Sequence, residues 1–335
     1  MRRNRRRLGF VRTVRRLLLG LGLLLAITAL GLLLIPMTEV ADATPVAGSA
    51  DWMAGLPDDA PLSGIVLPGT HDSATEYVQL AYFSRCQSLG VREQLEAGFR
   101  YLDVRLGTDE KSAAFKLMHG FTECRTGDFG GTLGLDAVLA DCCAFLDAHP
   151  TETILFAAKY EHGELTVPEV QRRLAACIAE RPEYWLLAER LPTLGEARGR
   201  LVLLRRWEDE AGLGAEAGVP LLWADQKSRE DTALSAAAEA QGGYTLHVQD
   251  RYKYETEEKW RAFTEALDTP AAEGDVLLNF LSTNGAAAYG HPWEYAKPLN
   301  SRLDALEGES LRGWIIVDFA SPKLAAKIYG ANTAG

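Results

Sequence analysis

The sequence is poor in cysteine, and none of its cysteines stands in a CxxC pair or another spacing typical of a zinc site. Its five cysteines are Cys86, Cys124, Cys142, Cys143 and Cys177. Because the number is odd, at least one thiol stays unpaired within the molecule. Two hypotheses are open: a bridge between Cys86 and Cys124, which would suit export into an oxidising compartment, or a set of small buried thiols.

Positive charge is also scarce beyond the start of the chain. Met1 to Arg16 holds eight of the 35 Lys and Arg residues and no acid, so 27 basic residues face 46 acidic ones in the remainder, a balance of −19. This balance argues against nucleic-acid binding and against adhesion to anionic membranes through bulk charge. With 47% hydrophobic and 24% charged residues, the composition is that of a globular protein with a sizeable core.

A long apolar run, Leu17 to Ile35, directly follows the basic end. As a helix it would be about 29 Å long, close to the thickness of a bilayer's hydrocarbon core. Its length favours an uncleaved anchor, whereas the small-residue site Ala41-Asp42-Ala43 favours a removable export signal, which we prefer. In both cases everything after residue 40 is exported. We therefore divide the chain into a signal or anchor (1–43), a linker (44–60) and a globular domain (61–335).

Short apolar, β-prone runs recur along the globular domain, and helical patterns separate several of them. The strand candidates are Gly64 to Leu67, Tyr101 to Leu106, Ala114 to Met118, Thr153 to Ala158, Arg200 to Leu204, Tyr244 to Val248, Val276 to Leu281 and Gly313 to Val317. The helical patterns include Val91 to Ala97, Leu135 to Ala148, Val167 to Glu180, Thr232 to Gln241, Glu255 to Leu267 and Pro322 to Tyr329. Nearly continuous hydrophobicity in the strands predicts an α/β fold with a parallel barrel buried on both faces. A doubly wound open sheet would give the same alternation and stays an alternative.

Polar residues follow most of these strands at their C-terminal ends. They are His71 with Asp72, then Arg105, His119, Lys159, Arg206, Asp250 and Asp318. In a (β/α)8 barrel such ends converge on one face, where the active site lies. Each residue alone has an ordinary explanation, such as a helix cap or a solvated charge. Helix caps would not require two histidines and three cations, so we expect these residues to form one site.

Several segments, in this order and spacing, resemble the bacterial phosphatidylinositol-specific phospholipases C of the X-domain type. They are LPGTHDS (67–73), QLEAGFRYLDVRL (94–106), LMHG (117–120), ETILFAAKYE (152–161), VQDRY (248–252) and GWIIVDF (313–319). The resemblance extends from about Gly64 to Asn332. It implies a distorted, incompletely closed TIM-type (β/α)8 barrel and a phosphatidylinositol diacylglycerol-lyase, which releases diacylglycerol and inositol 1,2-cyclic phosphate.

The resemblance also implies catalytic roles for two histidines. The inositol 2-hydroxyl is the nucleophile, so the reaction needs a base, an acid for the leaving oxygen, and positive charge against the phosphorane-like transition state. Histidines suit the two proton transfers because their pKa lies near neutrality. His71 resembles the general base, oriented by Asp318, and His119 with Asp72 resembles the general acid.

Arg105 bears on whether a metal ion is needed. Calcium-dependent relatives have acidic residues near this strand end and an asparagine after the first histidine, whereas here Arg105 and Asp72 occupy the corresponding places. A guanidinium supplies fixed positive charge and bidentate donors to phosphate. We therefore expect no metal and no cofactor, with Asp103 as a partner of Arg105. The alternative that Asp103 and nearby carboxylates bind a metal stays open.

Head-group binding is assigned by the same resemblance. Lys159, Arg206 and Asp250 resemble the partners of inositol hydroxyls, and Tyr252 resembles the aromatic that covers the apolar face of the ring. Arg205 competes with Arg206, because strand alternation lets only one of them point inward.

The expected partner is phosphatidylinositol or a glycosyl-phosphatidylinositol lipid at a membrane surface, met by a monomeric, extracytoplasmic protein. Tyr82 and Phe83, or the stretch from Tyr289 to Tyr295 with Trp293, are candidate lipid-facing aromatics. There are two alternatives. One is a related phosphodiesterase that acts on another head group or on glycosyl-phosphatidylinositol anchors, and the other is a catalytically silent lipid-binding module. The presence of both histidines and Arg105 disfavours the silent module.

Overall fold

The computed structural model describes residues 2–108, 114–227, 237–241, 243–270, 272–286 and 290–333. The strands are β1 (Leu67–Thr70), β2 (Tyr101–Gly107), β3 (Lys116–His119), β4 (Thr122–Glu123), β5 (Ile154–His162), β6 (Trp185–Leu186), β7 (Leu201–Arg205), β8 (Val219–Pro220), β9 (Ala237–Ala240), β10 (Thr245–Gln249), β11 (Val276–Phe280) and β12 (Trp314–Val317). The α-helices are α1 (Arg2–Leu34), α2 (Ala81–Ser84), α3 (Val91–Glu96), α4 (Leu135–Ala148), α5 (Val167–Ile178), α6 (Leu194–Ala197), α7 (Thr256–Leu267), α8 (Pro292–Ala305) and α9 (Pro322–Tyr329).

The sheet is a parallel barrel that does not close. Its strands lie in the order β6-β7-β5-β2-β1-β12-β11-β10-β9, and β8 pairs with β7 beside this path. Pairing is parallel from β7 through β10. Between β8 and β10, within the described residues, the Gln226 side chain bridges the opening: its amide donates to Val248 O at 3.0 Å and its oxygen accepts from Asp250 N at 2.9 Å. The predicted incompletely closed barrel is confirmed.

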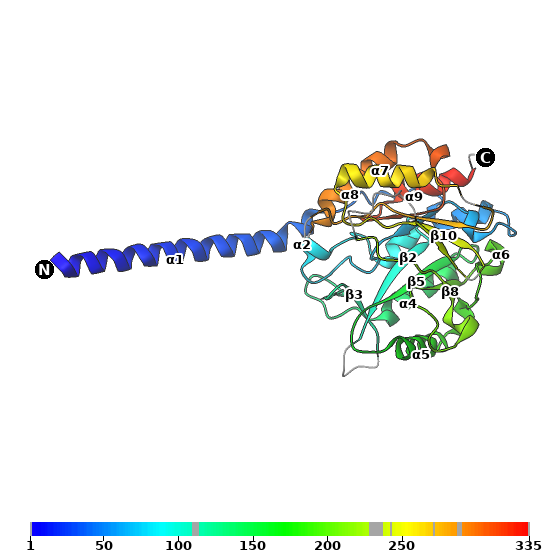
Figure 1. Ribbon diagram of the computed structural model, residues 1–335, viewed down its shortest axis with the longest axis horizontal. Helices are drawn as coiled ribbons and strands as arrows, with labels where there is room; N and C mark the ends of the chain where they lie inside the picture. Colours follow the sequence, from blue (N-terminus) through cyan, green and yellow to red (C-terminus); the bar gives the residue numbers. More distant parts are fainter. Residues whose placement is uncertain are drawn as a thin grey trace.

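Both faces of the sheet are buried, which explains the continuous hydrophobicity of the strands. Along β5, Leu155 and Ala157 join the cluster inside the barrel, whereas Ile154 and Phe156 join the cluster beneath α4 and α5. A third cluster lies between the sheet and α7, α8 and α9. Figure 1 shows these three helices together on one side of the sheet and α4 and α5 on the other.

Five of the predicted helices are present as α3, α4, α5, α7 and α9. The sequence did not indicate α8, because Pro298 stands in its interior. The helix predicted over Thr232–Gln241 is wrong in the part of this range that the structure describes, residues 237–241. Residues 228–236 lie outside the described part, and Ala237–Ala240 form β9, which pairs antiparallel with β10. Edge pairing there overrides the helix propensity of an alanine-rich run.

The strand expected over Ala114–Met118 is also not a parallel member of the barrel. It forms β3, which pairs antiparallel with β2 and then with β4. The run is apolar because Leu117 and Met118 pack in the core, and apolarity does not reveal the direction of a strand.

The bridge between Cys86 and Cys124 is not formed. All five cysteines are free thiols, and four of them are buried. The alternative of small buried thiols is the one that the structure contains. Burial raises the pKa of the Cys86 and Cys124 thiols, which keeps both in the neutral, unreactive form.

The segment predicted as a linker, 44–60, packs against the bottom of the barrel. Trp52 stacks on Tyr329 with ring centroids 5.0 Å apart, and Met53 is fully buried. The Arg100 guanidinium donates to the carbonyls of Ser49 and Ala50 and forms an ion pair with Glu152 at 2.9 Å. The segment therefore covers the end of the barrel opposite to the strands' C-terminal ends.

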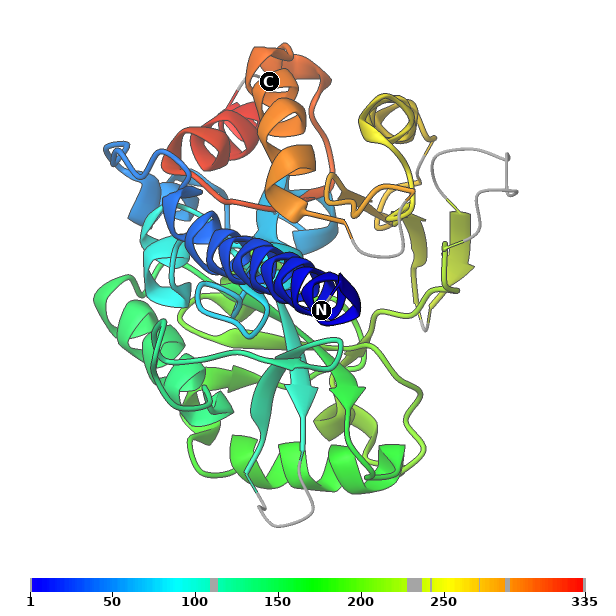
Figure 2. The ribbon, with the colours of Figure 1, turned by 90° about the vertical axis from the view of Figure 1, so that its left-hand side faces the viewer.

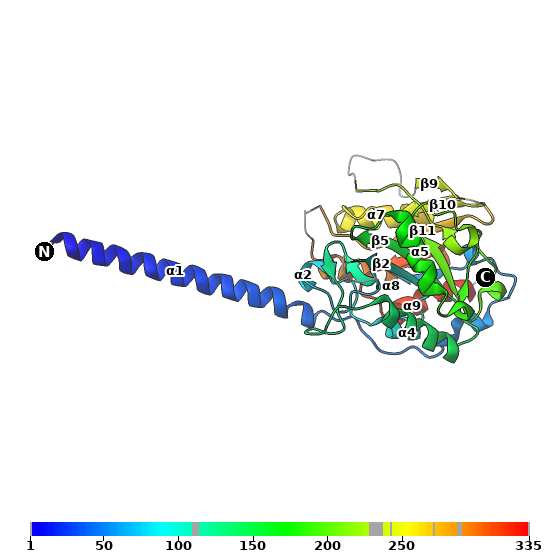
Figure 3. The same cartoon turned by 90° about the horizontal axis from the view of Figure 1, so that it is seen from below.

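Helix α1 projects away from the domain. Figures 1 and 3 show it as a single long rod, and in Figure 2 it points toward the viewer from the face of the domain. Within the described residues, Thr13–Thr38 is the one stretch long and apolar enough to cross a membrane. Its 18-residue apolar window has a mean hydropathy of 2.7, and none of that window is buried. Length and composition alone fit both an anchor and an export signal.

The buried pair of Arg100 and Glu152 gives a stability prediction. Both side chains are fully buried, so Glu152→Ala should lower the free energy of unfolding by about 3–5 kcal/mol, because it leaves a buried cation unpaired. Denaturant unfolding followed by circular dichroism measures the change. The exposed pair of Arg302 and Glu257 provides the control, and Glu257→Ala should leave the unfolding midpoint unchanged. Equal effects of the two substitutions would contradict this account of the core.

Candidate active site

A cavity of about 860 Å³ lies at the C-terminal ends of the strands. Eight of the residues expected from the sequence line it: His71, Arg105, His119, Lys159, Arg206, Asp250, Tyr252 and Asp318. The ninth, Asp72, is buried behind them, with 1% of its side chain exposed. The barrel thus gathers at one place side chains that lie almost 250 positions apart in the chain, as in the contact between His71 and Asp318.

The end of β1 positions His71 and Asp72. His71 N extends the strand pairing by donating to Val317 O at 3.0 Å. Asp72 then adopts a left-handed conformation, with φ of 43°, and its N–H donates to Asp103 Oδ2 at 3.3 Å. Aspartate tolerates this region better than most residues. The turn directs the Asp72 carboxylate inward beneath the two histidines.

His71 is held from β12. Its Nδ1 lies 2.8 Å from Asp318 Oδ1. The buried Gln87 amide fastens the two strand ends to each other, because it donates to His71 O and Val317 O. Asn300 adds a hydrogen bond to Asp318 O at 2.8 Å. The spacing between the imidazole and Asp318 is thereby fixed by groups outside the cavity.

His119 reaches the site through the antiparallel hairpin. Leu117 pairs with Leu106, so the chain runs back along β2 and brings His119 beside the strand end that carries Arg105. Gly120 follows with φ of 55°, a conformation that suits glycine, and begins the turn into β4. The His119 Nε2 atom lies 3.3 Å from Asp72 Oδ2.

The Asp72 carboxylate contacts His71, His119 and Arg105. Its Oδ2 lies 3.3 Å from the Nε2 atoms of both His71 and His119, and its Oδ1 lies 2.9 Å from Arg105 Nε. Arg105 is also held by Asp103 at 3.1 Å and by Glu161 at 3.3 Å. The expected partnership between Asp103 and Arg105 is present, and Arg105 is fixed on several sides.

The protonation of His71 follows from geometry and electrostatics together. Burial disfavours the charged ring, but Asp318 and Asp72 outweigh it and raise the pKa of His71 to about 9. Its Nε2 lies 2.9 Å from Arg105 Nη2. Because a guanidinium only donates, this contact requires a lone pair on Nε2 and places the ring proton on Nδ1, facing Asp318. With a pKa of about 9, the ring is mostly protonated near neutral pH, and the contact with Arg105 belongs to the neutral form.

His119 and Asp72 have shifts of opposite direction. Burial lowers the pKa of His119, although Asp72 opposes this change. Burial also raises the pKa of Asp72 against the pull of Arg105 and the two histidines. Despite their burial, Asp103 and Glu161 have lowered pKa values because of Arg105, with Glu161 at about 2. Asp103 and Glu161 therefore stay charged and hold the guanidinium.

The other half of the cavity carries the predicted head-group residues. Lys159 contacts Glu161 at 2.6 Å, and the Arg206 guanidinium lies over the Trp223 ring, 3.1 Å from its centroid. Trp223 donates to Asp250 at 3.1 Å. Tyr252 donates to Asp225 at 2.7 Å. This side of the cavity combines hydrogen-bonding groups with aromatic surface, which suits a polyol.

The choice of Arg206 over Arg205 agrees with the geometry. Arg206 lines the cavity, whereas Arg205 donates to the carbonyls of Gly218 and Trp207. Sequence reasoning missed Glu161, Trp223 and Asp225 as cavity residues. Alternation along β5 could have indicated Glu161, which lies two residues after Lys159. The acidic, Gly-rich stretch around Trp223 carries no such pattern.

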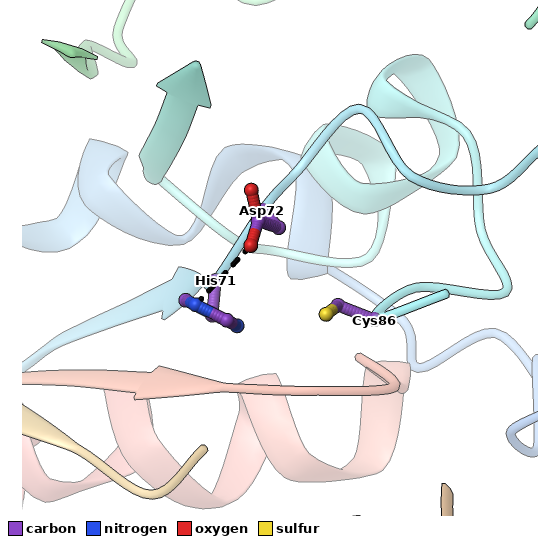
Figure 4. A group of neighbouring side chains, drawn as sticks. All are labelled: His71, Asp72 and Cys86. Atoms are coloured by element: carbon purple, nitrogen blue, oxygen red, sulfur yellow. Dashed lines mark ion pairs between the residues drawn. The ribbon is translucent and has the colours of Figure 1, made fainter. Parts of the chain in front are cut away.

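One cluster of donor atoms could hold a metal ion. His71, Asp72 and Cys86 offer ligand atoms within 4.8 Å of one another, and Figure 4 shows the consecutive His71 and Asp72 on one segment and Cys86 on another. However, Arg105 already contacts both His71 and Asp72. Burial also raises the pKa of Cys86, so the thiol stays protonated, whereas metals bind the thiolate. This donor set fits a fixed cation better than a metal ion.

Comparison with known proteins supports the resemblance. Residues 59–201 match the model of the family PI-PLC X 1. The 1-phosphatidylinositol phosphodiesterase of Staphylococcus aureus is 27% identical over 291 residues, covering 81% of this chain and 88% of that protein. The enzyme of the same name from Listeria monocytogenes is 24% identical and covers 84% of each chain. Residues 59–201 of this chain thus match the PI-PLC X family model, and most of its length is similar to bacterial 1-phosphatidylinositol phosphodiesterases.

Solved structures of the family share the fold. A mutant of the phosphatidylinositol-specific phospholipase C from Staphylococcus aureus superposes with a TM-score of 0.70 at 23% identity, covering 84% of this chain and 98% of that one. The phosphatidylinositol-specific phospholipase C from Listeria monocytogenes superposes with a TM-score of 0.61 at 20% identity, covering 85% and 98%. The barrel of this protein is therefore of the same type.

An NMR titration of the imidazole rings tests the site's electrostatics. His71 should titrate at about 9, above the ordinary value of about 6.5, and His119 should titrate below its ordinary value. Asp318→Asn should lower the pKa of His71, because it removes the charge that favours the imidazolium. The raised pKa contributes stability that is present below about pH 6.5 and lost as pH rises through about 9, and the variant should lose this dependence. A His71 that titrates at or below 6.5 would contradict the assignment.

Proposed function

We propose that this protein is a phosphatidylinositol-specific phospholipase C that cleaves the lipid into diacylglycerol and inositol 1,2-cyclic phosphate. One observation carries the proposal: two imidazoles and a guanidinium surround a single buried carboxylate within a cavity large enough for a lipid head group. The chemistry of this set matches intramolecular phosphoryl transfer, which needs a base, an acid and fixed positive charge.

His71 acts as the base in this mechanism. Its Nε2 takes the proton of the inositol 2-hydroxyl as that oxygen forms a bond to phosphorus. The resulting imidazolium is stabilised by Asp318 on Nδ1, and its new Nε2–H faces Asp72 Oδ2. The raised pKa of His71 makes this proton transfer favourable.

His119 acts as the acid. The bond between phosphorus and the diacylglycerol oxygen breaks as His119 gives its proton to that oxygen. Burial lowers the pKa of His119, which makes it a strong acid when protonated, and contact with Asp72 favours the protonated form. In the free enzyme the active arrangement, with His71 neutral and His119 charged, is therefore a minor one.

Arg105 supplies the positive charge at the phosphate. In the structure its Nη2 occupies the lone pair of His71 Nε2. A phosphodiester oxygen is a stronger acceptor for a guanidinium than a neutral imidazole. Substrate would therefore draw Arg105 away from His71 and free the base at the moment the phosphate arrives. This role requires no metal ion or other cofactor.

The head group is assigned to the half of the cavity with Lys159, Arg206, Asp250 and Tyr252. These side chains offer donors, acceptors and an aromatic face to a ring of hydroxyls. Export of the domain beyond the apolar N-terminal helix would bring the cavity to lipids outside the cytoplasm, where a monomer suffices for binding.

The proposal is tested with phosphatidylinositol micelles in excess chelator, followed by phosphorus NMR. We expect the cyclic phosphate to form under chelation. His71→Ala and His119→Ala should each lower turnover by about 10²–10⁴-fold, the usual range for the loss of an acid or a base. His149→Ala is the matched control: this histidine pairs with Asp51 at 2.8 Å away from the cavity, and its loss should leave turnover unchanged.

Two outcomes would contradict the proposal in different ways. Complete loss of turnover on chelation would overturn the role given to Arg105. Hydrolysis of phosphatidylcholine without hydrolysis of phosphatidylinositol would overturn the head-group assignment while leaving the acid–base pair in place.

A further inference from the structure

The residues that directly follow the candidate membrane span lie against the mouth of the cavity. Glu39 is the first residue after Thr38, where the apolar window ends. It is buried, and its Oε1 lies 2.7 Å from Nε2 of the buried His291. The other ring nitrogen of His291 lies 2.6 Å from Tyr82 O, and the ring stacks on Tyr82 at 3.9 Å. A buried carboxylate held in this way is part of the folded domain.

Further contacts fasten the same segment. Arg85 Nη1 donates to Pro36 O at 2.5 Å and lies 3.4 Å from Glu39 O. Ala41 N donates to Ser88 Oγ at 2.9 Å. The segment Pro36–Ala41, here called the latch, thus bonds to the chain just after α2 and, through His291, to the start of α8. Cleavage after Ala43 would remove the entire latch and leave His291 buried without its carboxylate.

The latch touches the two loops that form the cavity's rim. Leu80, Phe83 and Ser84, on either side of Tyr82, line the cavity, and so do Gly290 and Pro292, on either side of His291. Figure 1 shows α1 meeting the domain beside α2. The end of the apolar helix is therefore fixed at the opening through which a lipid would enter.

Exposed apolar side chains lie on the same side of the domain. Among the described residues after residue 39, the exposed large hydrophobics are Val40, Leu80, Phe121 and Phe129. Leu80 and Phe121 line the cavity, Val40 adjoins Glu39, and Phe129 follows Asp128, whose charge acts on Arg85 beside the latch. Of the aromatics expected to face lipid, Tyr82 and Trp293 pack instead on His291 and Phe319, and Tyr289 lies outside the described residues.

We infer that α1 remains attached as a membrane anchor and that the contact between Glu39 and His291 locks the cavity's mouth against the bilayer. The apolar helix crosses the membrane, the eight arginines before it stay on the cytoplasmic side, and the latch fixes the domain's tilt on the other. Phe121 and Phe129 then face the lipid. A flexible tether would leave the domain free to tumble, whereas the latch keeps the opening at the surface that supplies the lipid.

Attachment is tested first. The full chain, with a C-terminal tag, is expressed in a bacterium, fractionated and analysed by intact mass spectrometry. We expect the chain in the membrane fraction with residues 2–43 present. A released chain that begins at Thr44 would overturn the inference.

Hydrogen exchange in lipid nanodiscs tests the latch. Glu39→Ala and His291→Ala should each speed amide exchange in residues 36–44 and 81–85 by about tenfold or more, because either one frees the segment to open locally. The double variant should exchange no faster than the faster single variant. Glu39→Gln should stay close to the parent chain, since an amide oxygen still accepts from the ring. Unchanged exchange in Glu39→Ala would contradict the latch.

A photocrosslinker tests the orientation. With p-benzoylphenylalanine at Phe129, crosslinks to lipid acyl chains should form in the parent chain and fall severalfold in Glu39→Ala. Asp51→Ala is the matched control, because it breaks another pair of histidine and carboxylate at 2.8 Å, distant from the latch, and should change neither exchange nor crosslinking. Equal crosslinking with and without Glu39 would overturn the proposed orientation. None of these measurements requires hydrolysis, so their outcomes do not depend on whether the proposed function is correct.

Discussion

The Asp72 carboxylate is the interaction on which the rest of the site depends. Almost all of it is removed from water, yet His71, His119 and Arg105 all contact it. Burial favours its neutral form, and only the surrounding positive charge offsets that preference. The left-handed turn after β1 places the carboxylate at this point, and Asp103 fixes both the turn and the guanidinium. His71, His119 and Arg105 lie together because all three contact the same carboxylate.

The barrel converts order along the chain into proximity at its mouth. Parallel strands end on one face, so the polar residues at the C-terminal ends of β1, β2, β5 and β12 converge there although they lie far apart in the sequence. This much could be predicted, since the apolar runs and the residues after them are visible in the sequence. The gathering of His71, Arg105 and Asp318 follows from that rule. The antiparallel direction of β3 does not, although the hairpin still returns His119 to the site.

What the sequence could not provide are contacts that depend on packing between distant segments. Trp223 beneath Arg206, and Glu39 beside His291, have no periodic pattern that marks them. The alanine-rich run at Ala237–Ala240 has helix propensity, and only the free edge of β10 makes it a strand. The predicted bridge between Cys86 and Cys124 was wrong for a similar reason. Two cysteines on loops at one end of a barrel need not have the geometry of a disulfide.

Replacement of Asp72 by asparagine tests the central claim most directly. Asparagine keeps the shape and tolerates the left-handed backbone, so the fold should persist and only the charge is lost. With phosphatidylinositol at saturation, Asp72→Asn should lower kcat by about 10²-fold or more, because His119 loses the charge that favours its acid form. The variant should still fold, because Arg105 keeps its pairs with Asp103 and Glu161, and an unfolding curve checks this. An unchanged kcat in a folded variant would contradict the claim that Asp72 organises the site.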